Sequence, residues 1–469
     1  YAELCAVALA ERGVHVYVYH ELAPTPMLSF AVRQLGCGCG IVVSASHNAG
    51  IYNGIKCYGP DGCQMTDEPA ARVFAEIEKI PYFLPAEKSF EDFLAEGGVE
   101  FIAPELWERY YETVLGERLA TVPSDNLNLL YTPLCGTGNK PVRTVLGRIG
   151  VNVAVVPAQE KPDGDFKTCE YPNPETDAAL NESYKIARET HPDLILGTDP
   201  DSDRVGIMVR NHDGEFQPVT GNQTGVLLLD YLIGAMKRAG KLPEKPVALK
   251  TIVPTEMARK VAESNGVKCF DTFTGFKFMA EKKNALEASG EGKVIFSYEE
   301  SYGYMLGDYV RDKDAVTASM LLTEMAAWYY AQGMTLFDAL NALYEKYGYY
   351  AEKTHNLVMP GLDGLRDMAK LMADLRANPP TEISGVKGTV RKDYTDGSVI
   401  DCATGAKSRM ELSGSNVLRY EMADGTSLIV RPSGTEPKVK VYIMAKADSK
   451  AESDAKVAAL ADAAKEIVK

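Results

Sequence analysis

A serine that is followed directly by a histidine, Ser46-His47, stands just after the apolar run 41–43. A hydroxyl beside an imidazole can act as a nucleophile or as a carrier of a phosphoryl group. The same residue types are also typical of a turn in which serine and histidine bond their own backbone. Because no Gly-x-Ser-x-Gly sequence surrounds Ser46, an esterase triad is disfavoured. The pattern therefore indicates either a phosphate carrier or a turn.

Three aspartates stand at alternate positions, Asp199, Asp201 and Asp203, and Arg204 follows the last of them. Carboxylates with this spacing on a tight loop can converge on one cation, and an all-oxygen donor set favours Mg²⁺ over Zn²⁺. Arg204 adds a planar guanidinium that can pair with a phosphate. A solvated acidic turn and the nucleophile strand of an aspartate-dependent phosphatase are the alternatives. An EF-hand calcium loop is excluded, because the sixth position is not glycine and the twelfth is Arg210.

A second acidic loop follows the apolar run 294–296 and contains Glu299 and Ser301. Carboxylates and hydroxyls of this kind can hydrogen-bond the hydroxyls of a sugar, although an exposed acidic turn has the same composition. Lys277 and the charged segment 311–314 would add positive charge if they closed on the same site. Ordinary surface charge explains these two features equally well.

A fourth polar loop follows the expected strand 427–430 and contains Arg431, Ser433, Gly434 and Thr435. Glycine lets backbone N–H groups approach an oxyanion, and Arg431 can pair with it through two hydrogen bonds. The loop is not a Walker A motif, since Gly-Lys-Ser/Thr is absent, and a β-turn is the plain alternative. Together the four loops offer a hydroxyl that can carry a phosphoryl group, a cation site, a sugar-binding site and a phosphate-binding site. Phosphoryl transfer on a sugar phosphate would use all four.

Alternating helices and strands must position these loops, and this alternation is typical of layered α/β domains. Strands are expected at 14–20, 40–43, 128–131, 151–156, 194–196, 247–251 and 293–296, with helices such as 2–12 and 222–237 between them. Three of the polar loops directly follow such strands. Ligands of open α/β sheets bind just beyond the carboxyl ends of strands. We therefore expect a single cleft that is lined by one loop from each domain.

The pattern changes near residues 378–380, after which short alternating strands predict a smaller antiparallel α+β domain. Its strands are expected at 417–422, 427–430 and 439–445, and its helix at 451–468. Linker-like segments near 123–125 and 242–246 complete the division. The sequence thus predicts domains over 1–123 with the serine loop, 124–243 with the aspartates, 244–375 with the sugar loop and 376–469 with the phosphate loop.

The composition is that of a globular protein, with 45% apolar and 25% charged residues and a net charge of −15. This negative charge disfavours nucleic acid and anionic membranes as partners, and no apolar stretch approaches the ~20 residues of a membrane span. The nine cysteines lack the spacing of a disulfide scaffold, which favours the cytoplasm. Because paired Cys-x-x-Cys spacing is absent, buried free thiols are favoured over a zinc site for Cys5, Cys37, Cys39, Cys57 and Cys63.

The motifs, taken in order, resemble the motif set of the α-D-phosphohexomutases, and especially its phosphoglucomutase/phosphomannomutase branch. They comprise 44–48 with 52–56, then 199–204, 299–303 and 431–437, so the resemblance covers essentially the whole chain. It implies three mixed α/β/α layered domains and a C-terminal antiparallel α+β domain around a central cleft. It also implies an isomerase that is an intramolecular phosphotransferase with Mg²⁺ as its cofactor.

The resemblance further implies a role for each matching residue. Ser46 would carry the phosphoryl group, and Mg²⁺ would bind an oxygen of the phosphorylated Ser46 together with Asp199, Asp201 and Asp203. Phosphate and sugar would be bound by Arg204, Glu299, Ser301, Arg431, Ser433, Gly434 and Thr435. Candidates for proton transfer and charge support are His47, Lys56 and Lys277.

The implied reaction is reversible phosphoryl transfer between C1 and C6 of glucose phosphate through a phosphoserine and glucose 1,6-bisphosphate. Hexose phosphates and the bisphosphate would be the partners. A phosphomannomutase or phosphopentomutase is a close alternative, because Glu299 and Ser301 would read hydroxyls common to several sugars. An inactive sugar-phosphate-binding homologue and a hydrolase are alternatives of other classes.

Three features depart from the family pattern. Ala49 stands where the family usually has proline, and Cys135 where many relatives have histidine. The family's first strand and a glycine-rich segment with an arginine, both upstream of the serine loop, have no counterpart here. The first domain is therefore expected to be N-terminally incomplete.

Overall fold

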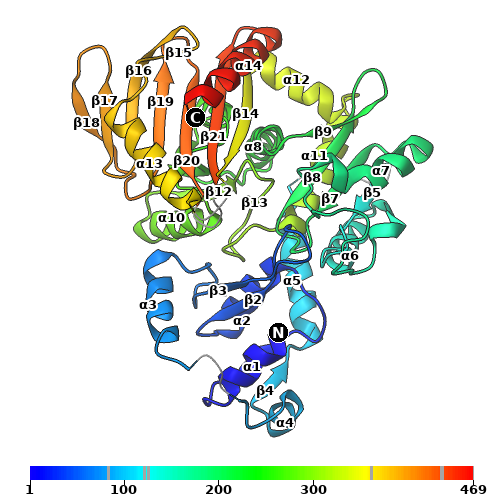
Figure 1. Cartoon of the computed structure of the whole chain (residues 1–469). Coiled ribbons are helices and arrows are strands. Elements are labelled where there is room, and N and C mark those ends of the chain that lie inside the picture. The colour runs from blue at the N-terminus through cyan, green and yellow to red at the C-terminus, as the bar shows by residue number, and fades with distance from the viewer. Residues whose placement is uncertain (82–84, 120–122, 124–126, 360–362, 434–437, 468–469) are drawn as a thin grey trace. The chain divides into compact units, whose positions relative to one another are not determined.

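The computed structural model describes residues 1–81, 85–119, 123, 127–359, 363–433 and 438–467 (Figure 1). The chain divides into two compact units. The larger unit comprises Tyr1–Thr251, Asn265–Phe270 and Thr274–Ala339, and the smaller comprises Ile252–Ser264, Asp271–Phe273 and Leu340–Lys469. Gly434 and Thr435, which the sequence assigns to phosphate binding, lie outside the described residues.

The first part of the larger unit contains two small sheets. Strand β1 (Val16–Val18) pairs in parallel with β4 (Val99–Phe101), and β2 (Gly40–Val43) pairs antiparallel with β3 (Ile55–Tyr58). The helices of this part are α1 (Ala2–Ala10), α2 (Thr25–Leu35), α3 (Asp67–Ile77), α4 (Phe90–Glu96) and α5 (Pro104–Gly116). The bounds of β2 are as predicted, and helix α2 packs on this strand. The serine loop is therefore the connection between β2 and β3.

A five-stranded sheet follows, in the order β6-β5-β7-β8-β9. Its strands are β5 (Asn128–Thr132), β6 (Asn152–Val155), β7 (Leu194–Thr198), β8 (Val205–Arg210) and β9 (Phe216–Val219). Strands β6, β5 and β7 are parallel, and β8 and β9 continue the sheet antiparallel. The connecting segments form α6 (Asn139–Arg148), the 3₁₀ turn η1 (Pro157–Gln159) and α7 (Asp177–Thr190). The aspartate loop is the tight hairpin between β7 and β8.

The next sheet has the order β11-β10-β12-β13. Its strands are β10 (Pro246–Thr251), β11 (Lys268–Thr272), β12 (Lys293–Tyr298) and β13 (Tyr304–Met305). Parallel pairing joins β10 and β12, whereas β12 and β13 are antiparallel. The helices in this part are α8 (Gly221–Arg238), α10 (Phe276–Ser289) and α11 (Ala315–Tyr330), whereas α9 (Met257–Ser264) belongs to the smaller unit. The sugar loop is the turn between β12 and β13.

Helix α11 is a buried element of the larger unit. All but two of its residues, Trp328 and Tyr330, are buried. A helix that is apolar on all sides belongs in a core. The helix packs against α5, α6, α8, β7, β8 and β13. Its N-cap is Asp314, whose carboxylate accepts the backbone N–H groups of Val316 and Thr317. Because α11 is held from several sides, the charged segment 311–314 that precedes it is held in place as well.

The smaller unit contains an eight-stranded sheet in which every pairing is antiparallel, as predicted. Its order is β14-β21-β20-β19-β16-β17-β18, with β15 beside β16. The strands are β14 (Tyr349–Val358), β15 (Glu382–Ile383), β16 (Val386–Asp393), β17 (Ser398–Asp401), β18 (Lys407–Arg409), β19 (Leu418–Met422), β20 (Ser427–Pro432) and β21 (Lys438–Ala447). Helices α13 (Gly364–Ala377) and α14 (Lys450–Ile467) pack against β21, while α12 (Leu336–Tyr347) precedes β14.

The smaller unit begins earlier in the chain than the expected fourth domain at residue 376. Strand β14 forms ten paired positions with β21, and side chains of α13 belong to the same core as β19 and β20. The segment 378–380, where the sequence pattern changes, therefore connects α13 to β15 inside this unit.

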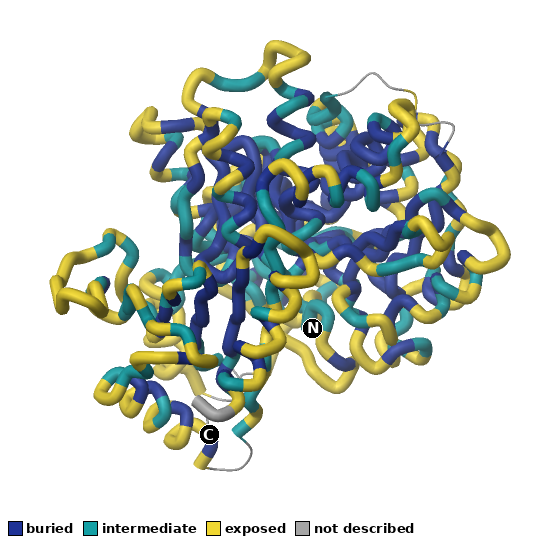
Figure 2. The backbone as a smooth tube through the Cα atoms, turned by 90° about the horizontal axis from the view of Figure 1, so that it is seen from above, coloured by how far each residue is buried: buried dark blue, intermediate teal, exposed yellow. Residues whose placement is uncertain are grey.

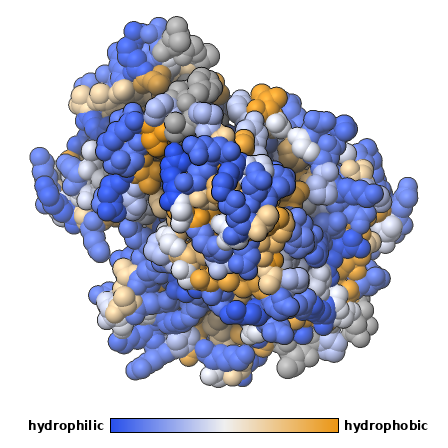
Figure 3. Space-filling view, turned by 90° about the horizontal axis from the view of Figure 1, so that it is seen from below, coloured by the Kyte–Doolittle hydropathy of each residue, from blue (hydrophilic) through white to orange (hydrophobic). Residues whose placement is uncertain are grey.

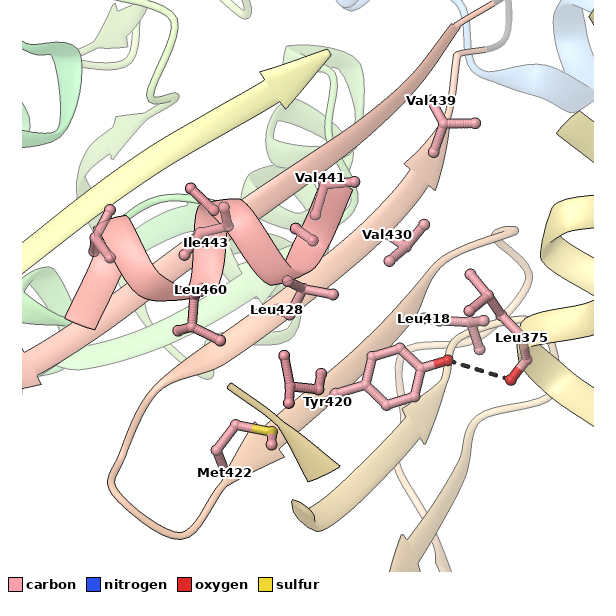
Figure 4. Packing of buried hydrophobic residues seen from close by; sticks show 14 of the residues in the cluster. Leu375, Leu418, Tyr420, Met422, Leu428, Val430, Val439, Val441, Ile443 and Leu460 are labelled. Carbon is pink, nitrogen blue, oxygen red and sulfur yellow. Dashed lines mark hydrogen bonds between the residues drawn. The ribbon is translucent and has the colours of Figure 1, made fainter. Parts of the chain in front are cut away.

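Both faces of the sheet in the smaller unit carry apolar clusters. One face carries a cluster with Leu428, Val430 and Ile443, together with side chains of α13 and α14 (Figure 4). In this cluster the Tyr420 hydroxyl donates to the backbone carbonyl of Leu375 at 3.3 Å. The residues between these, such as Ile429, face a second cluster on the other side of the sheet. This alternation explains why β20 is apolar at consecutive positions.

Truncation of this core is expected to destabilise the fold. Leu428 is fully buried, so Leu428→Ala should lower the free energy of unfolding by about 2–5 kcal/mol through lost burial and a residual cavity. Chemical denaturation followed by circular dichroism measures this change. Lys407→Ala, at an exposed position of β18, is the matched control and should change stability by less than about 0.5 kcal/mol. An equal effect of both substitutions would contradict the assignment of Leu428 to the core.

Surface features agree only in part with the sequence analysis. Cys5, Cys37, Cys39, Cys57 and Cys63 are free thiols as predicted, but only Cys63 is buried and Cys39 is exposed. The prediction of burial is wrong for the other four, because they lie in short helices, loops and two-stranded sheets that few elements cover.

In Figure 2 exposed residues collect in loops and on outer helix faces, and the face in Figure 3 is largely hydrophilic. No described helix combines the length and the apolar character that a membrane crossing would require.

Candidate active site

Three of the predicted loops meet in the larger unit. The Ser46 hydroxyl donates to Asp199 Oδ2 at 3.2 Å, which joins the serine loop to the aspartate loop. The aspartate loop also contacts the sugar loop, because Arg204 Nη1 donates to the carbonyl of Ser301 at 3.2 Å and Arg204 forms a backbone bridge with Gly303. The hypothesis that loops following separate strands converge on one site is thus supported for these three.

The serine loop holds Ser46 in a left-handed backbone conformation, with φ of 54°. This conformation is uncommon for a residue other than glycine, and strain of this kind clusters at functional sites. The Ser44 hydroxyl accepts the N–H of Ser46 at 2.8 Å and donates to Asp201 Oδ1. Ser46 Oγ also lies 3.2 Å from His47 Nδ1. Ser44 therefore fixes the backbone of the serine loop and directs Ser46 towards the carboxylates.

The three aspartates are buried in the hairpin between β7 and β8, with exposed fractions of 0% for Asp199, 5% for Asp201 and 1% for Asp203. Such buried carboxylates need compensating charge. Lys56 Nζ provides it at 2.6 Å from Asp201 Oδ2 and 3.5 Å from Asp203 Oδ2. Lys313 Nζ lies 3.3 Å from the same oxygen of Asp203. Two ammonium groups thus face the aspartate loop.

Burial and neighbouring charges shift the pKa values of Asp199, Asp203 and His47. Burial and the charges of Asp203 and Asp201 raise the pKa of Asp199 well above its ordinary value. Burial alone would also raise the pKa of Asp203, but the charges of Lys313 and Lys56 lower it below its usual range. Burial and the nearby Arg204 lower the pKa of His47 to about 3, so its ring is neutral at pH 7. A neutral imidazole beside the Ser46 hydroxyl can accept a hydrogen bond.

The donor set of the aspartate loop fits a hard divalent cation. Its three buried carboxylates offer only oxygen atoms, and Asp203 Oδ1 has no hydrogen-bond partner. In the part of the chain that the structure describes, no three histidine, cysteine, aspartate or glutamate side chains are arranged to hold a metal ion. In the aspartate loop, Lys56 lies against Asp201 and Asp203, while Asp199 accepts a hydrogen bond from Ser46.

The sugar loop is ordered by its own hydrogen bonds. Glu299 N donates to the carbonyl of Gly303, and Glu299 Oε1 accepts the N–H of Gly275 at 3.0 Å. The loop contains another left-handed residue, Tyr302, with φ of 66°. Ser301 presents its carbonyl to Arg204. The loop is therefore held rigidly beside the aspartates.

Two predicted regions have other contacts. Lys277 Nζ forms an ion pair with Asp67 of α3 at 2.6 Å. In the smaller unit, Arg431 Nη1 donates to the Tyr442 hydroxyl at 3.4 Å, and Ser433 N donates to the carbonyl of Lys438. Lys277 is thus paired with an acidic residue of α3, and the described part of the phosphate loop is hydrogen-bonded to β21.

Sequence reasoning missed several groups around this site. Apart from its position two residues before Ser46, nothing in the sequence marks Ser44 as a functional residue. Glu175 pairs with Arg204 Nη1 at 3.2 Å, and nothing in the sequence marks it either. Lys313 was only one of several charges in the segment 311–314. Its importance becomes visible through its contact with Asp203.

Comparison with protein families gives a consistent result along the chain. Models of the phosphoglucomutase/phosphomannomutase family match residues 1–82 as α/β/α domain I, 108–214 as α/β/α domain II, 220–347 as α/β/α domain III and 356–464 as the C-terminal domain. Together these matches cover most of the sequence.

Individual proteins show the same similarity. The chain is 34% identical to a phosphoglucomutase of Staphylococcus aureus over 451 residues, which is 95% of this chain and 79% of that protein. Its fold is similar to that of parafusin, a phosphoglucomutase from Paramecium, with 18% identity, a TM-score of 0.67 and coverage of 97% and 82% of the two chains. N-acetylphosphoglucosamine mutase of Aspergillus fumigatus, solved with GlcNAc-6P and magnesium, has 14% identity, a TM-score of 0.54 and full coverage of both chains.

Proposed function

Because the chain belongs to the phosphoglucomutase/phosphomannomutase family, we propose that it transfers a phosphoryl group reversibly between C1 and C6 of glucose phosphate. It is an isomerase of the intramolecular phosphotransferase class. The observation that carries the proposal is the contact between the Ser46 hydroxyl and a buried carboxylate loop that also faces two ammonium groups. This surrounding supports Ser46 as the phosphoryl carrier.

The reaction begins with Ser46 phosphorylated. The bond between phosphorus and Ser46 Oγ breaks, and a bond forms between phosphorus and a hydroxyl oxygen of the hexose phosphate. The sugar hydroxyl loses its proton, and Ser46 Oγ gains one. The product is a hexose 1,6-bisphosphate, whose other phosphoryl group then returns to Ser46 by the reverse step. His47, 3.2 Å away and neutral, supports this cycle by holding the serine oxygen in place.

The cationic groups stabilise the charge of the phosphoryl group in transit. Lys56, Lys313 and Arg204 are anchored by carboxylates, so they need little reorganisation when charge develops. Such preorganised positive charge is the main source of catalysis in phosphoryl transfer. Lys277, which forms an ion pair with Asp67, is proposed to give additional positive charge.

Magnesium is proposed as the cofactor, held by Asp199, Asp201, Asp203 and the oxygen of Ser46. When bound, the ion would neutralise charge on the phosphoryl oxygens. The three buried carboxylates support this assignment, since a divalent cation would add to the counter-charge that the Lys56 ammonium gives them. Glu299 and Ser301 are proposed to bind the sugar hydroxyls. The distal phosphate is assigned to Arg431, Ser433, Gly434 and Thr435.

Removal of the metal provides a direct prediction. Treatment with EDTA should reduce mutase activity at least about 100-fold, and added Mg²⁺ should restore it, because the aspartate loop then regains its divalent counter-charge. A coupled assay for glucose 6-phosphate measures the rate. Addition of Ca²⁺ in place of Mg²⁺ is the control for simple charge replacement and should restore much less. Full activity after exhaustive chelation would contradict the metal assignment.

The choice of sugar is tested by turnover. Coupled assays with glucose 1-phosphate, mannose 1-phosphate and ribose 1-phosphate should give the highest kcat/KM for glucose 1-phosphate. Equal or higher turnover of the mannose or ribose compound would replace glucose in the proposal. Release of inorganic phosphate without isomerisation would indicate a hydrolase. Absence of turnover, with binding of hexose phosphate retained, would indicate a sugar-phosphate-binding homologue.

A further inference from the structure

Lys313 occupies a narrow place between the sugar loop and the aspartate loop. Its side chain is only 9% exposed, and its ammonium lies 3.3 Å from Asp203 Oδ2 and 5.2 Å from the centroid of the Phe276 ring. A methyl group on Gly303 would overlap Lys313 Cδ, so glycine at that position leaves room for the lysine stem. The Lys313 stem therefore passes directly beside the Gly303 backbone on its way to Asp203.

Asp312 competes for the same ammonium. Its Oδ1 accepts the N–H of Lys313 at 2.8 Å and the Lys313 ammonium at 3.1 Å. Its Oδ2 accepts the hydroxyl of Tyr58 at 2.6 Å. Tyr58 is fully buried and Asp312 is 2% exposed, so water does not replace this bond. Each oxygen of the carboxylate thus has its own partner.

The tyrosine comes from the strand that follows the serine loop. Tyr58 and Lys56 are two residues apart on β3, so their side chains leave the same face of the strand. Lys56 contacts Asp201 and Asp203, and Tyr58 contacts Asp312. Strand β3 therefore contacts the aspartate loop through Lys56 and also contacts, through Tyr58, the carboxylate that binds the Lys313 ammonium.

We propose that Tyr58 and Asp312 are positioning residues that hold the Lys313 ammonium at Asp203 during phosphoryl transfer. With Oδ2 saturated by the tyrosine, Asp312 shares the ammonium with Asp203. Loss of the tyrosine hydroxyl leaves Oδ2 unpaired in a buried site, and the carboxylate then draws the ammonium towards itself. This inference rests on the proposed function, because the charge that Lys313 offsets belongs to the transferring group.

The chain offers a matched comparison in Tyr110. This tyrosine is also fully buried, and its hydroxyl donates to Asp314 Oδ2 at 2.9 Å. Asp314 caps α11 and, among the described residues, forms no hydrogen bond or ion pair with Lys313. Tyr58→Phe and Tyr110→Phe each remove a buried tyrosine hydroxyl that donates to an aspartate. They differ in that Asp314 Oδ2 keeps the Tyr309 hydroxyl as a donor at 2.6 Å.

The test compares kcat and KM of the full chain for glucose 1-phosphate in wild type, Tyr58→Phe, Tyr110→Phe, Lys313→Met and the double variant Tyr58→Phe/Lys313→Met. Tyr58→Phe should lower kcat about tenfold and change KM less than about twofold. Tyr110→Phe should leave both constants near wild type while lowering Tm. In the Lys313→Met background, Tyr58→Phe should have no further effect on kcat, because the two residues act through one ammonium.

Each other outcome has a defined meaning. Equal effects of Tyr58→Phe with and without Lys313, or equal effects of the two tyrosine substitutions on kcat, would overturn the proposal in favour of a purely structural role. A crystal structure of Tyr58→Phe supplies a readout that is independent of turnover: Lys313 should move away from Asp203, and an unmoved ammonium would also overturn it. Gly303→Ala provides a second way to displace the lysine if Tyr58→Phe does not fold. Wild-type protein without mutase activity would instead remove the proposed function, and the crystallographic result would still decide the positioning role.

Discussion

Ser46→Ala is expected to abolish mutase turnover while leaving the fold intact. The substitution removes the only oxygen that the mechanism uses to accept and return the phosphoryl group, so kcat should fall by about 10⁴-fold or more. The fold should persist because Ser46 is half-buried in a loop and lies outside the apolar clusters. Intact mass spectrometry after incubation with glucose 1,6-bisphosphate should detect an added phosphoryl group on wild type and none on the variant.

Ser289→Ala is the matched control for this experiment. Ser289 is an exposed serine at the end of α10 whose hydroxyl only bonds the carbonyl of Leu286. Its replacement should leave turnover and phosphorylation unchanged. Retained turnover in Ser46→Ala would exclude a phosphoserine at this position. A loss of thermal stability comparable to that of a core cavity would contradict the placement of Ser46 outside the apolar clusters.

The sequence contains enough local information to locate the elements that carry the site. Short apolar runs that end in polar residues predicted β2, β7 and β12, and each is present with its loop at the carboxyl end. The left-handed backbone of Ser46, Ser202 and Tyr302 could not be read from residue type, because these positions are held by contacts with other loops.

The partners of each charged side chain are long-range and therefore escaped the sequence. Lys56 meets Asp201 across 145 residues, and Tyr58 meets Asp312 across 254. Alternate aspartates indicated a cation site, but the local pattern contains nothing that would place two lysine ammonium groups there. Only the packing of β3 and of the segment before α11 brings these charges together.

The extent of the last sheet was underestimated for a related reason. Strand β14 carries charged and polar residues that obscure its alternation, and it pairs with β21 about 90 residues later in the chain. A strand whose partner is so distant gives little local signal. The composition change at residues 378–380 therefore marks a connection inside the unit rather than its beginning.

Asp203→Asn is expected to have the second large effect, on both activity and stability. The Asp203 carboxylate is 1% exposed and faces the ammonium groups of Lys56 and Lys313. An amide keeps the shape of the side chain but removes the charge that anchors these two cations. Because Lys56 still has Asp201 and Lys313 still has Asp312, the loss of unfolding free energy should be about 2–3 kcal/mol rather than larger.

The effect on turnover should exceed the effect on folding. Loss of Asp203 removes one proposed ligand of Mg²⁺ and releases Lys313 from its position, so kcat should fall by about 10²- to 10³-fold. Isothermal titration with Mg²⁺ should show weaker binding, and urea denaturation gives the stability change separately. Asp213→Asn, at an exposed turn between β8 and β9, is the control and should alter none of these quantities. If Asp203→Asn kept wild-type kcat and Mg²⁺ affinity while losing only stability, the carboxylate would serve the fold alone, and the cation site would have to be sought without it.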